Sequence, residues 1–508
     1  MRYVTGEDRH QMTMLPKSLD DYVDEDNPCR VIDAFVNCLD LKEMAFKYAV
    51  PKDSGRPPFN PGDMLKLFVY GYQNKVRSSR RLQKETLRNV EVMWLLNGLT
   101  PDDKTICNFR TDNNKALKKV FRAFNHLCIE LGLFGKKVVA IDGSKIKADN
   151  SRNSRYTKDG AEKQLVRLEK QITEYLNDLE RSDSAEDVEP SMEREAVEVA
   201  LEKLNARKAE LDEILKKIEE NDGEPVCTVD EDAALMKQSG GKGFDVCYNV
   251  QTAVDEKNGL IAAFNVTDHC NDMNELHDMV ERSKKALGVE EIDALADGGY
   301  SNGKEIHASE SSGATCYIPK PEPSHQPKEK EFRRENFKYD KENDQYTCPA
   351  GNIMRYVRTR ERDGFKVYAN RAACKGCPVK DKCTKSKTLR ELERNPYQEE
   401  VDRADRNAKE NPDFYRRRQE LSEHPFGVVK RIWGYDQFLC RGIEKVTGET
   451  SLMFMAFNLR RAISILGIEK VIEGIKGWAL LHEKLRDNLF DYVFIVRGTL
   501  KTPFLAAR

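Results

Sequence analysis

Residues 136–149, KKVVAIDGSKIKAD, mark the point where helical sequence gives way to strand-forming sequence. The apolar run Val138–Ile141 predicts a buried strand that ends at Asp142. Residues 243–268 hold two β-rich runs around a DEKNG turn, which predicts a hairpin. Residues 292–302 and 314–321, IDALADGGYSN and ATCYIPKP, add strands that alternate with helical stretches. The order β, insertion, β, β, α, β, α, β predicts an α/β core built on a mixed sheet flanked by helices.

The chain before this core is expected to be helical over residues 1–134. Met64, Leu65, Phe68, Val69 and Tyr72 recur at helical spacing within residues 59–86. Residues 78–98 predict a second helix that ends at Gly98, and residues 100–135 predict a turn and a third helix. Several short helices with a basic face suit a DNA-binding domain, although a plain helical bundle with a solvated face is the alternative. The basic side chains of this face are Arg77, Arg80, Arg81, Lys84 and Arg88.

The segment 161–222 interrupts the core. Its leucines and isoleucines recur three and four residues apart on both sides of the polar stretch SDSAEDVEPS. This spacing predicts an antiparallel helical hairpin of the coiled-coil type. We expect it to act as a spacer or as a contact between copies of the chain.

Length and charge limit the possible partners. At about 150 residues per domain, 508 residues predict roughly three units. The net charge of −2 excludes a uniformly basic surface, but residues 51–90 and 318–387 are basic and residues 161–222 are acidic. No apolar run approaches the ~18 residues of a membrane span, and the N-terminus lacks the apolar region of a secretory signal. The chain is therefore expected in the cytoplasm, without a membrane partner.

Two aspartates share one sequence context. Asp142 and Asp297 each follow a predicted buried strand and precede a glycine, so each is expected at an edge of the same sheet. Such a pair can hold Mg²⁺ through oxygen ligands, although strand-end aspartates often only cap a turn. Glu423 offers a third acid and precedes Lys430 by two helical turns. Glu444 and Glu449 are rival third acids, but their apolar surroundings favour packing.

Four of the thirteen cysteines cluster, and the others are expected to be scattered reduced thiols. Cys348, Cys374, Cys377 and Cys383 suit one tetrahedral structural Zn²⁺, with reduced free thiols as the alternative. Neighbouring arginines indicate a DNA-contacting module, and they are Arg355, Arg358, Arg360 and Arg362. His269 is expected to be a hydrogen-bonding loop residue rather than a metal ligand, and His424 has at most a minor role in proton transfer.

Taken in order, these segments resemble a family. The stretches VVAIDGSKIKA, ALADGGYSNGKEI, CPAGN…CKGCPVKDKC and EHPFGVVKRIWG are similar to those of bacterial insertion-sequence transposases of the DDE type with a Tyr-Arg-Glu-Lys signature. The resemblance implies an RNase H-like core with the catalytic acids Asp142, Asp297 and Glu423. The signature maps onto Tyr415, Arg418, Glu423 and Lys430. Four residues rather than the usual three separate Arg418 from Glu423, so Arg416 or Arg417 is an alternative.

The resemblance also implies an organisation and a chemistry. It divides the chain into a helical DNA-binding domain at 1–134, a catalytic core at 136–320 interrupted by the hairpin 161–222, a basic, zinc-ribbon-like insertion with four cysteines at 321–390 and a C-terminal helical part of the core at 391–508. Two Mg²⁺ ions, for which Mn²⁺ can substitute, would promote cleavage and strand transfer. Asp142 would bridge both ions, with Asp297 and Glu423 on one each.

The implied partner is double-stranded DNA, namely the terminal inverted repeats of the element and its target. Lys145, with the basic residues around Asp142, would contact phosphates. At least a homodimer is expected, because two DNA ends must be brought together. The alternatives are an RNase H-like nuclease without strand transfer and a catalytically inert DNA-binding protein.

Overall fold

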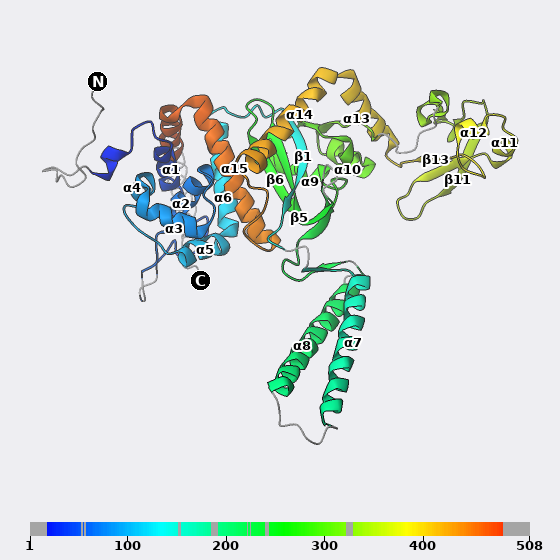
Figure 1. Ribbon diagram of the computed structural model, residues 1–508. Helices are drawn as coiled ribbons and strands as arrows, with labels where there is room; N and C mark the ends of the chain where they lie inside the picture. The colour runs from blue at the N-terminus through cyan, green and yellow to red at the C-terminus, as the bar shows by residue number, and fades with distance from the viewer. Residues whose placement is uncertain are drawn as a thin grey trace, which may run out of the picture.

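The computed structural model describes residues 18–480, apart from 52–53, 55–56, 151–153, 184–191, 221, 224, 239–242 and 322–328. The N-terminal part is helical, as predicted (Figure 1). After the short turn η1 it contains six helices, α1 to α6, joined by turns. Their bounds are Leu19–Tyr22 (η1), Pro28–Asn37 (α1), Pro61–Gln73 (α2), Ser79–Arg88 (α3), Val90–Leu95 (α4), Asp103–Asp112 (α5) and Asn114–Glu130 (α6).

The single helix predicted for residues 78–98 is wrong, because the chain breaks at Asn89. This residue is extended, with φ −106° and ψ 114°, and its side chain accepts hydrogen bonds from the backbone N–H groups of Glu91 and Val92. An asparagine that bonds to the following amides is a preferred N-cap and begins a new helix. The segment therefore forms α3 and α4.

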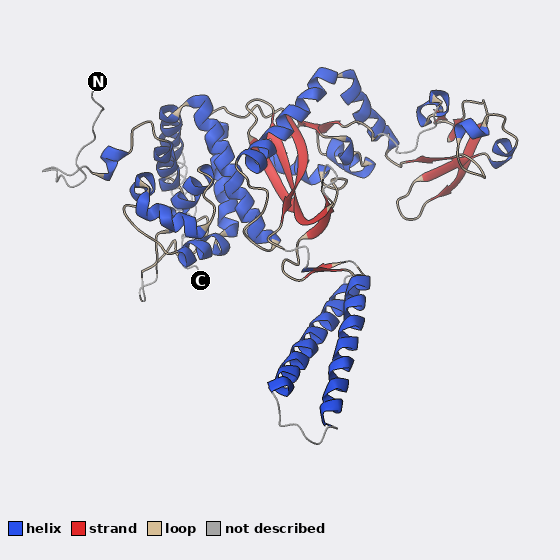
Figure 2. Ribbon diagram, in the orientation of Figure 1, coloured by secondary structure: helices blue, strands red, loops and turns tan. Residues whose placement is uncertain are grey.

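The central sheet has the order β4-β5-β1-β7-β8, with β6 also paired to β5 (Figure 2). β5 runs antiparallel to β1, whereas β7 and β8 are parallel to it, so the sheet is mixed as expected. β4 is not among the predicted strands, and it pairs with residues 244–247 of β5 beside β6. The strands are Val138–Lys147 (β1), Ala234–Lys237 (β4), Phe244–Asp255 (β5), Ile261–Thr267 (β6), Ile292–Leu295 (β7) and Ala314–Tyr317 (β8).

Helices cover both faces of this sheet. α9 packs on β5 and β6, α10 and α13 pack on β8, and α14 packs on β1. α14 continues directly into a π-helical turn, η7. The helices are Leu276–Leu287 (α9), Gly303–Ser311 (α10), Gln398–Glu410 (α13), Pro412–Phe426 (α14), Gly427–Ile432 (η7) and Ile443–Leu466 (α15).

α15 packs against both the sheet and the N-terminal helices. It packs against α6, α2 and β6. Its Asn458 donates to Asn125 of α6 at 2.8 Å and accepts from the backbone N–H of Ile261 in β6 at 2.9 Å. The helical domain and the core therefore share one buried interface. In the described residues no single helix has the length and apolarity of a membrane span, although α15 and residues 468–480, bent by 113°, meet that measure as a pair.

The predicted hairpin is formed by α7, Lys158–Asp183, and α8, Met192–Glu220. Both helices project from the sheet, and a two-stranded ribbon, Arg155–Tyr156 (β2) with Val226–Cys227 (β3), closes their base (Figure 1). Lys208 of α8 pairs with Glu169 of α7 at 2.8 Å. Buried residues at the base include Tyr156, Leu211 and Ile218, so the hairpin has a small core of its own.

The cysteine-rich segment forms a separate antiparallel sheet, β13-β12-β11-β10-β9, on the side of the core away from the N-terminal helices (Figure 1). Because β13 completes this sheet, the module extends beyond residue 390. Its elements are Lys338–Asp340 (β9), Gln345–Thr347 (β10), Ile353–Thr359 (β11), Lys366–Ala369 (β12), Arg371–Lys375 (α11), Lys380–Cys383 (α12) and Glu391–Arg394 (β13), preceded by the short turns Lys330–Phe332 (η5) and Arg334–Asn336 (η6).

Candidate active site

The two aspartates lie beside each other on neighbouring strands. The prediction that the strand ends at Asp142 is wrong, because β1 continues to Lys147 and stays paired with β5 over that length. In the parallel pairing of β1 with β7, Ala140 is opposite Leu295, and Asp142 and Asp297 each follow two residues later. Burial raises the pKa of Asp142 to about 6, and the charge of Asp297 adds to this rise. Asp297 also caps the short turn η4, Gly298–Tyr300, by accepting from the Gly299 N–H at 2.8 Å. The pair therefore combines one desolvated carboxylate with one held rigidly by a turn.

Helix α14 supplies the groups that face this pair. Tyr415, Arg418 and Ser422 are spaced three and four residues apart and so share one side of the helix. The Tyr415 hydroxyl donates to the carbonyl oxygen of Ala296 at 3.2 Å, next to Asp297. The Arg418 guanidinium opposes the rise in the pKa of Asp142, and the buried Ser422 hydroxyl lies beside the same carboxyl. Sequence reasoning did not single out Ser422.

Arg418, rather than its two neighbours, is the arginine at the acid pair. Arg417 points elsewhere and bonds to Glu256 at 2.9 Å, and Arg416 is exposed. The guanidinium of Arg418 also lies 5.9 Å from the centre of the Tyr415 ring. The tertiary structure thus brings the first two signature residues together around Asp142 and Asp297.

Glu423 lies one residue beyond Ser422 and is exposed. Its carboxylate accepts from Gln419 Nε2 at 3.0 Å. Throughout the part of the chain that the structure describes, no three His, Cys, Asp or Glu side chains are grouped so that they could hold a metal ion. Asp142 and Asp297 are therefore brought together, and Glu423 does not complete a metal-binding group with them.

The last signature residue, Lys430, is tied to β1 from the π-helical turn η7. Its Nζ donates to Ser144 Oγ at 2.9 Å and to the carbonyl oxygen of Lys145 at 2.7 Å. Lys145 itself donates through Nζ to the carbonyl oxygen of Lys237 at 2.9 Å. The positive charge of Lys430 is thereby held two to three residues along the strand from Asp142.

The rival acids on α15 have structural contacts. Glu449 is fully buried and accepts from the backbone N–H groups of Leu439 and Cys440 at 2.9 and 3.1 Å. Arg77 pairs with it at 3.3 Å. Glu444 pairs with Lys115 at 3.3 Å on the surface. The packing role expected for this stretch agrees with these contacts.

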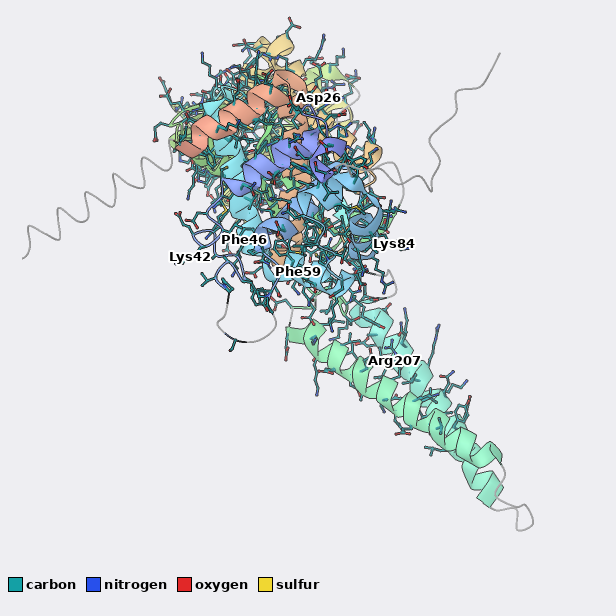
Figure 3. The ribbon with its side chains drawn as sticks, turned by 90° about the vertical axis from the view of Figure 1, so that its left-hand side faces the viewer. Asp26, Lys42, Phe46, Phe59, Lys84 and Arg207 are labelled. Atoms are coloured by element: carbon teal, nitrogen blue, oxygen red, sulfur yellow. The ribbon has the colours of Figure 1, made fainter. Side chains whose placement is uncertain are left out.

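The basic residues proposed for DNA contact differ in their surroundings. Arg80, Arg81 and Lys84 are exposed on α3, and Figure 3 places Lys84 at the surface of the helical domain. Arg77 instead lies over the Tyr435 ring at 4.2 Å and donates to the carbonyl oxygen of Gln437 at 2.9 Å. Arg77 therefore links the helical domain to the segment before α15.

In the cysteine-rich module, Arg358 of β11 and Arg360 of the turn after it are paired with acids. Arg358 bonds to Glu391 at 3.2 Å, and Arg360 bonds to Glu393 at 2.8 Å and also to Asp363. The bonds to Glu391 and Glu393 join β11 and the turn after it to β13, across β12. The charge available for phosphate at these two positions is reduced accordingly.

The four clustered cysteines line a single cavity. All four are free thiols and half-buried. Burial raises the pKa of the Cys383 thiol, and the other three sulfurs add to the rise. The backbone N–H of Asn352 approaches Cys348 Sγ at 3.3 Å. The sulfurs are near one another, but they are not grouped as a metal site within the described residues.

The two histidines have ordinary partners. His269 Nδ1 lies 2.5 Å from Glu275 Oε1, as expected of a hydrogen-bonding loop residue, and this bond raises the pKa of His269. The His424 ring packs at 5.7 Å against Phe457, and burial lowers its pKa.

Comparison with known proteins adds two matches. Residues 347–463 match the family described as Transposase DDE domain, and residues 17–112 match Transposase domain (DUF772). These two matches support an insertion-sequence transposase of the DDE type. No curated protein and no solved structure matches it.

The matched segments cover only part of the candidate site. The DDE-domain match covers the four clustered cysteines, α14 with Tyr415, Arg418 and Glu423, and Lys430. Asp142 and Asp297 lie outside both matches. The geometry of β1 and β7 is therefore what connects these aspartates to the matched helix.

Proposed function

We propose that this transposase cuts and joins DNA at the ends of its own insertion sequence, by divalent-metal-dependent phosphoryl transfer at Asp142, Asp297 and Glu423. The observation that carries the proposal is the parallel register of β1 and β7, which sets Asp142 beside Asp297 under the signature helix α14. The strand order, with one antiparallel strand beside β1 and two parallel strands beyond it, supports an RNase H-like core.

The residues suit a hard divalent cation. Two neighbouring carboxylates, one desolvated, repel each other unless a positive charge lies between them, and oxygen ligands are those that Mg²⁺ and Mn²⁺ prefer. Asp142 and Asp297 would hold the metal. Glu423 is exposed and not grouped with them in this structure, and it would have to turn toward them from α14 to become the third ligand. When bound, such ions would supply Lewis-acid activation of the attacking and leaving oxygens.

The chain's own groups then act on the DNA strand. Tyr415 fixes α14 against the residue before Asp297, so the helix and the acid move as one unit. Arg418 and Lys430 place positive charge on either side of Asp142, where phosphate oxygens would approach. Lys145, Arg80, Arg81 and Lys84 would contribute salt-dependent contacts to the backbone of double-stranded DNA.

The acids are tested by cleavage of DNA that carries the element's ends in Mg²⁺. We expect Asp142→Asn, Asp297→Asn and Glu423→Gln each to lower cleavage by more than the roughly 10–100-fold that the loss of a supporting residue costs. Glu420→Gln, an exposed acid on the same helix, serves as the matched control and should cleave normally. Cleavage by all three variants at the wild-type rate would refute the assignment.

A substrate with a precut 3′-end separates the candidate activities. Joined products support transposition, hydrolysis alone supports a nuclease, and binding without Mg²⁺-dependent cleavage supports an inert DNA-binding protein. The DDE-domain match favours the first of these.

We also propose that Cys348, Cys374, Cys377 and Cys383 bind one structural Zn²⁺. Four half-buried thiols around one cavity, one approached by a backbone N–H, support this proposal. Metal analysis of the purified chain should find about one zinc, which the double variant Cys374→Ser/Cys377→Ser loses. Cys270→Ser, a change at an exposed cysteine outside the cluster, should keep it. An unchanged zinc content in the double variant would contradict the assignment.

A further inference from the structure

A buried chain of hydrogen bonds runs beneath the acid pair. The Tyr300 hydroxyl donates to Gln251 Oε1, and Gln251 Nε2 donates to Asp272 Oδ1 at 2.6 Å. Asn249 Nδ2 donates to the same Asp272 oxygen at 2.8 Å. Tyr300 and Gln251 are fully buried, and Asn249 is 1% exposed. The chain thus joins η4, β5 and the loop before α9.

The chain of bonds contacts the backbone next to each acid. Gln251 is paired with Gly143 in the β1–β5 register, immediately after Asp142. A Cβ on Gly143 would lie 2.4 Å from Gln251 Nε2 and 2.6 Å from Asp272 Oδ1, so the amide and the carboxylate rest directly on this strand. Tyr300 ends the turn η4 that Asp297 caps.

The carboxylate of Asp272 determines which atom donates and which accepts in each hydrogen bond of this chain. A carboxylate such as Asp272 only accepts, so the Gln251 amide must present its nitrogen to Asp272 and its oxygen to Tyr300. Burial raises the pKa of Tyr300, and the charges of Asp272, Asp142 and Asp297 raise it further, so the hydroxyl remains a donor. Each buried polar group in the chain depends on the next, and the loss of one leaves another unpaired.

We propose that Tyr300 and Gln251 are positioning residues that set the separation of Asp142 and Asp297. This inference rests on the proposed metal-dependent function. Neither residue is placed to touch DNA, and both act through the backbone of β1 and η4. Partners that support metal ligands typically change metal affinity or activity by about 10–100-fold when they are removed.

The structure provides a matched control for Tyr300. Tyr248 is also fully buried, lies on the same sheet, and donates its hydroxyl to Asp230 at 2.7 Å. Tyr300→Phe and Tyr248→Phe therefore each remove one buried tyrosine–acceptor bond, but only the first belongs to the chain beneath the acids. Thermal unfolding of both variants measures the cost to stability separately from the effect on the site.

Mn²⁺ binding to the full chain, followed by electron paramagnetic resonance, and Mg²⁺ titration of cleavage are the two readouts. We expect Tyr300→Phe to weaken Mn²⁺ binding and to raise the half-saturating Mg²⁺ concentration by about ten-fold or more. Tyr248→Phe should match the wild type in both. Gln251→Leu should act like Tyr300→Phe, and the double variant should be no worse than Gln251→Leu alone.

Two outcomes overturn the inference and are distinguishable. If the wild type binds Mn²⁺ at a site that Asp142→Asn removes, but Tyr300→Phe binds as Tyr248→Phe does, the positioning role is refuted and the proposed function stands. If no Mn²⁺ binding is sensitive to Asp142→Asn, the proposed function fails and the inference fails with it. Should Tyr300→Phe not fold, Asp272→Asn supplies the same comparison from the other end of the chain.

Discussion

Asp142 and Asp297 have the same sequence context but different chemistry in the folded chain. Asp142 is half-buried, and the charge of Arg418 opposes the effect of desolvation on its pKa. The Asp297 carboxylate accepts a hydrogen bond from the backbone N–H of Gly299, so it stabilises a turn as well as carrying charge. The alternative that strand-end aspartates only cap turns therefore describes part of the role of Asp297. What separates the two residues is the set of groups that the tertiary structure places beside each one.

Adding a single methyl group at Gly143 tests how closely the chain of hydrogen bonds packs against β1. Gly143→Ala would place a Cβ within 2.4 Å of Gln251 Nε2, and that amide cannot withdraw without breaking the bond to Asp272. We expect lower thermal stability and a strong loss of Mg²⁺-dependent cleavage. Gly477→Ala, which meets nothing within 4 Å, is the control and should be neutral or slightly stabilising. Wild-type cleavage by Gly143→Ala would show that the strand tolerates the displacement.

At the scale of elements, α14 and α15 have different tasks. α14 carries Tyr415, Arg418 and Ser422 to the acid pair on β1 and after β7, and η7 continues it so that Lys430 reaches β1. α15 is buried among the N-terminal helices and β6 and contributes no group to the acid pair. Its charged residue Glu449 instead joins three segments of the chain.

Glu449 should be a determinant of stability. Glu449→Ala removes the acceptor of two backbone N–H groups and the partner of Arg77, and breaking a buried ion pair costs about 3–5 kcal/mol. Chemical denaturation should show this loss in the free energy of unfolding. Glu444→Ala, an exposed change at the start of the same helix, should alter it little. Equal stability of the two variants would mean that the buried contacts of Glu449 are energetically unimportant.

At the scale of the whole molecule, two insertions extend from the sheet without adding a strand to it. The hairpin enters between β1 and β4, and the cysteine-rich module enters between β8 and α13. Figure 3 places Arg207 on the projecting hairpin, away from Phe46 and Phe59 in the helical domain. Each insertion has its own hydrophobic cluster, so each can be mutated or shortened without removing residues that pack in the main hydrophobic core.

Replacing residues 157–225 with a short glycine–serine linker tests the role of the hairpin. Because the hairpin core is separate, thermal unfolding of the remaining chain should be nearly unchanged. If the hairpin is a contact between copies rather than a spacer, the two roles expected from its sequence, light scattering should show the mass fall from dimer to monomer. Cleavage of a single DNA end should persist, whereas joining of two ends should be lost. An unchanged mass would assign the contact between copies to another surface.

The helical N-terminal part, the mixed sheet and the hairpin could be predicted from the sequence by itself, because helical periodicity, β-rich runs and turn residues act over only a few neighbours. Strand β4 and the continuation of β1 beyond Asp142 were not predicted. The continuous helical pattern of residues 78–98 did not predict the break at Asn89, where the side chain of this one residue caps a new helix. Only the tertiary structure decided that Arg418 and not Arg417 meets Asp142, that Arg77 is held by Glu449, and that Tyr300 and Gln251 lie beneath the acids. These contacts join residues that are 49 to 372 positions apart in the sequence. A local sequence pattern therefore cannot predict which distant residue will pack against a given side chain.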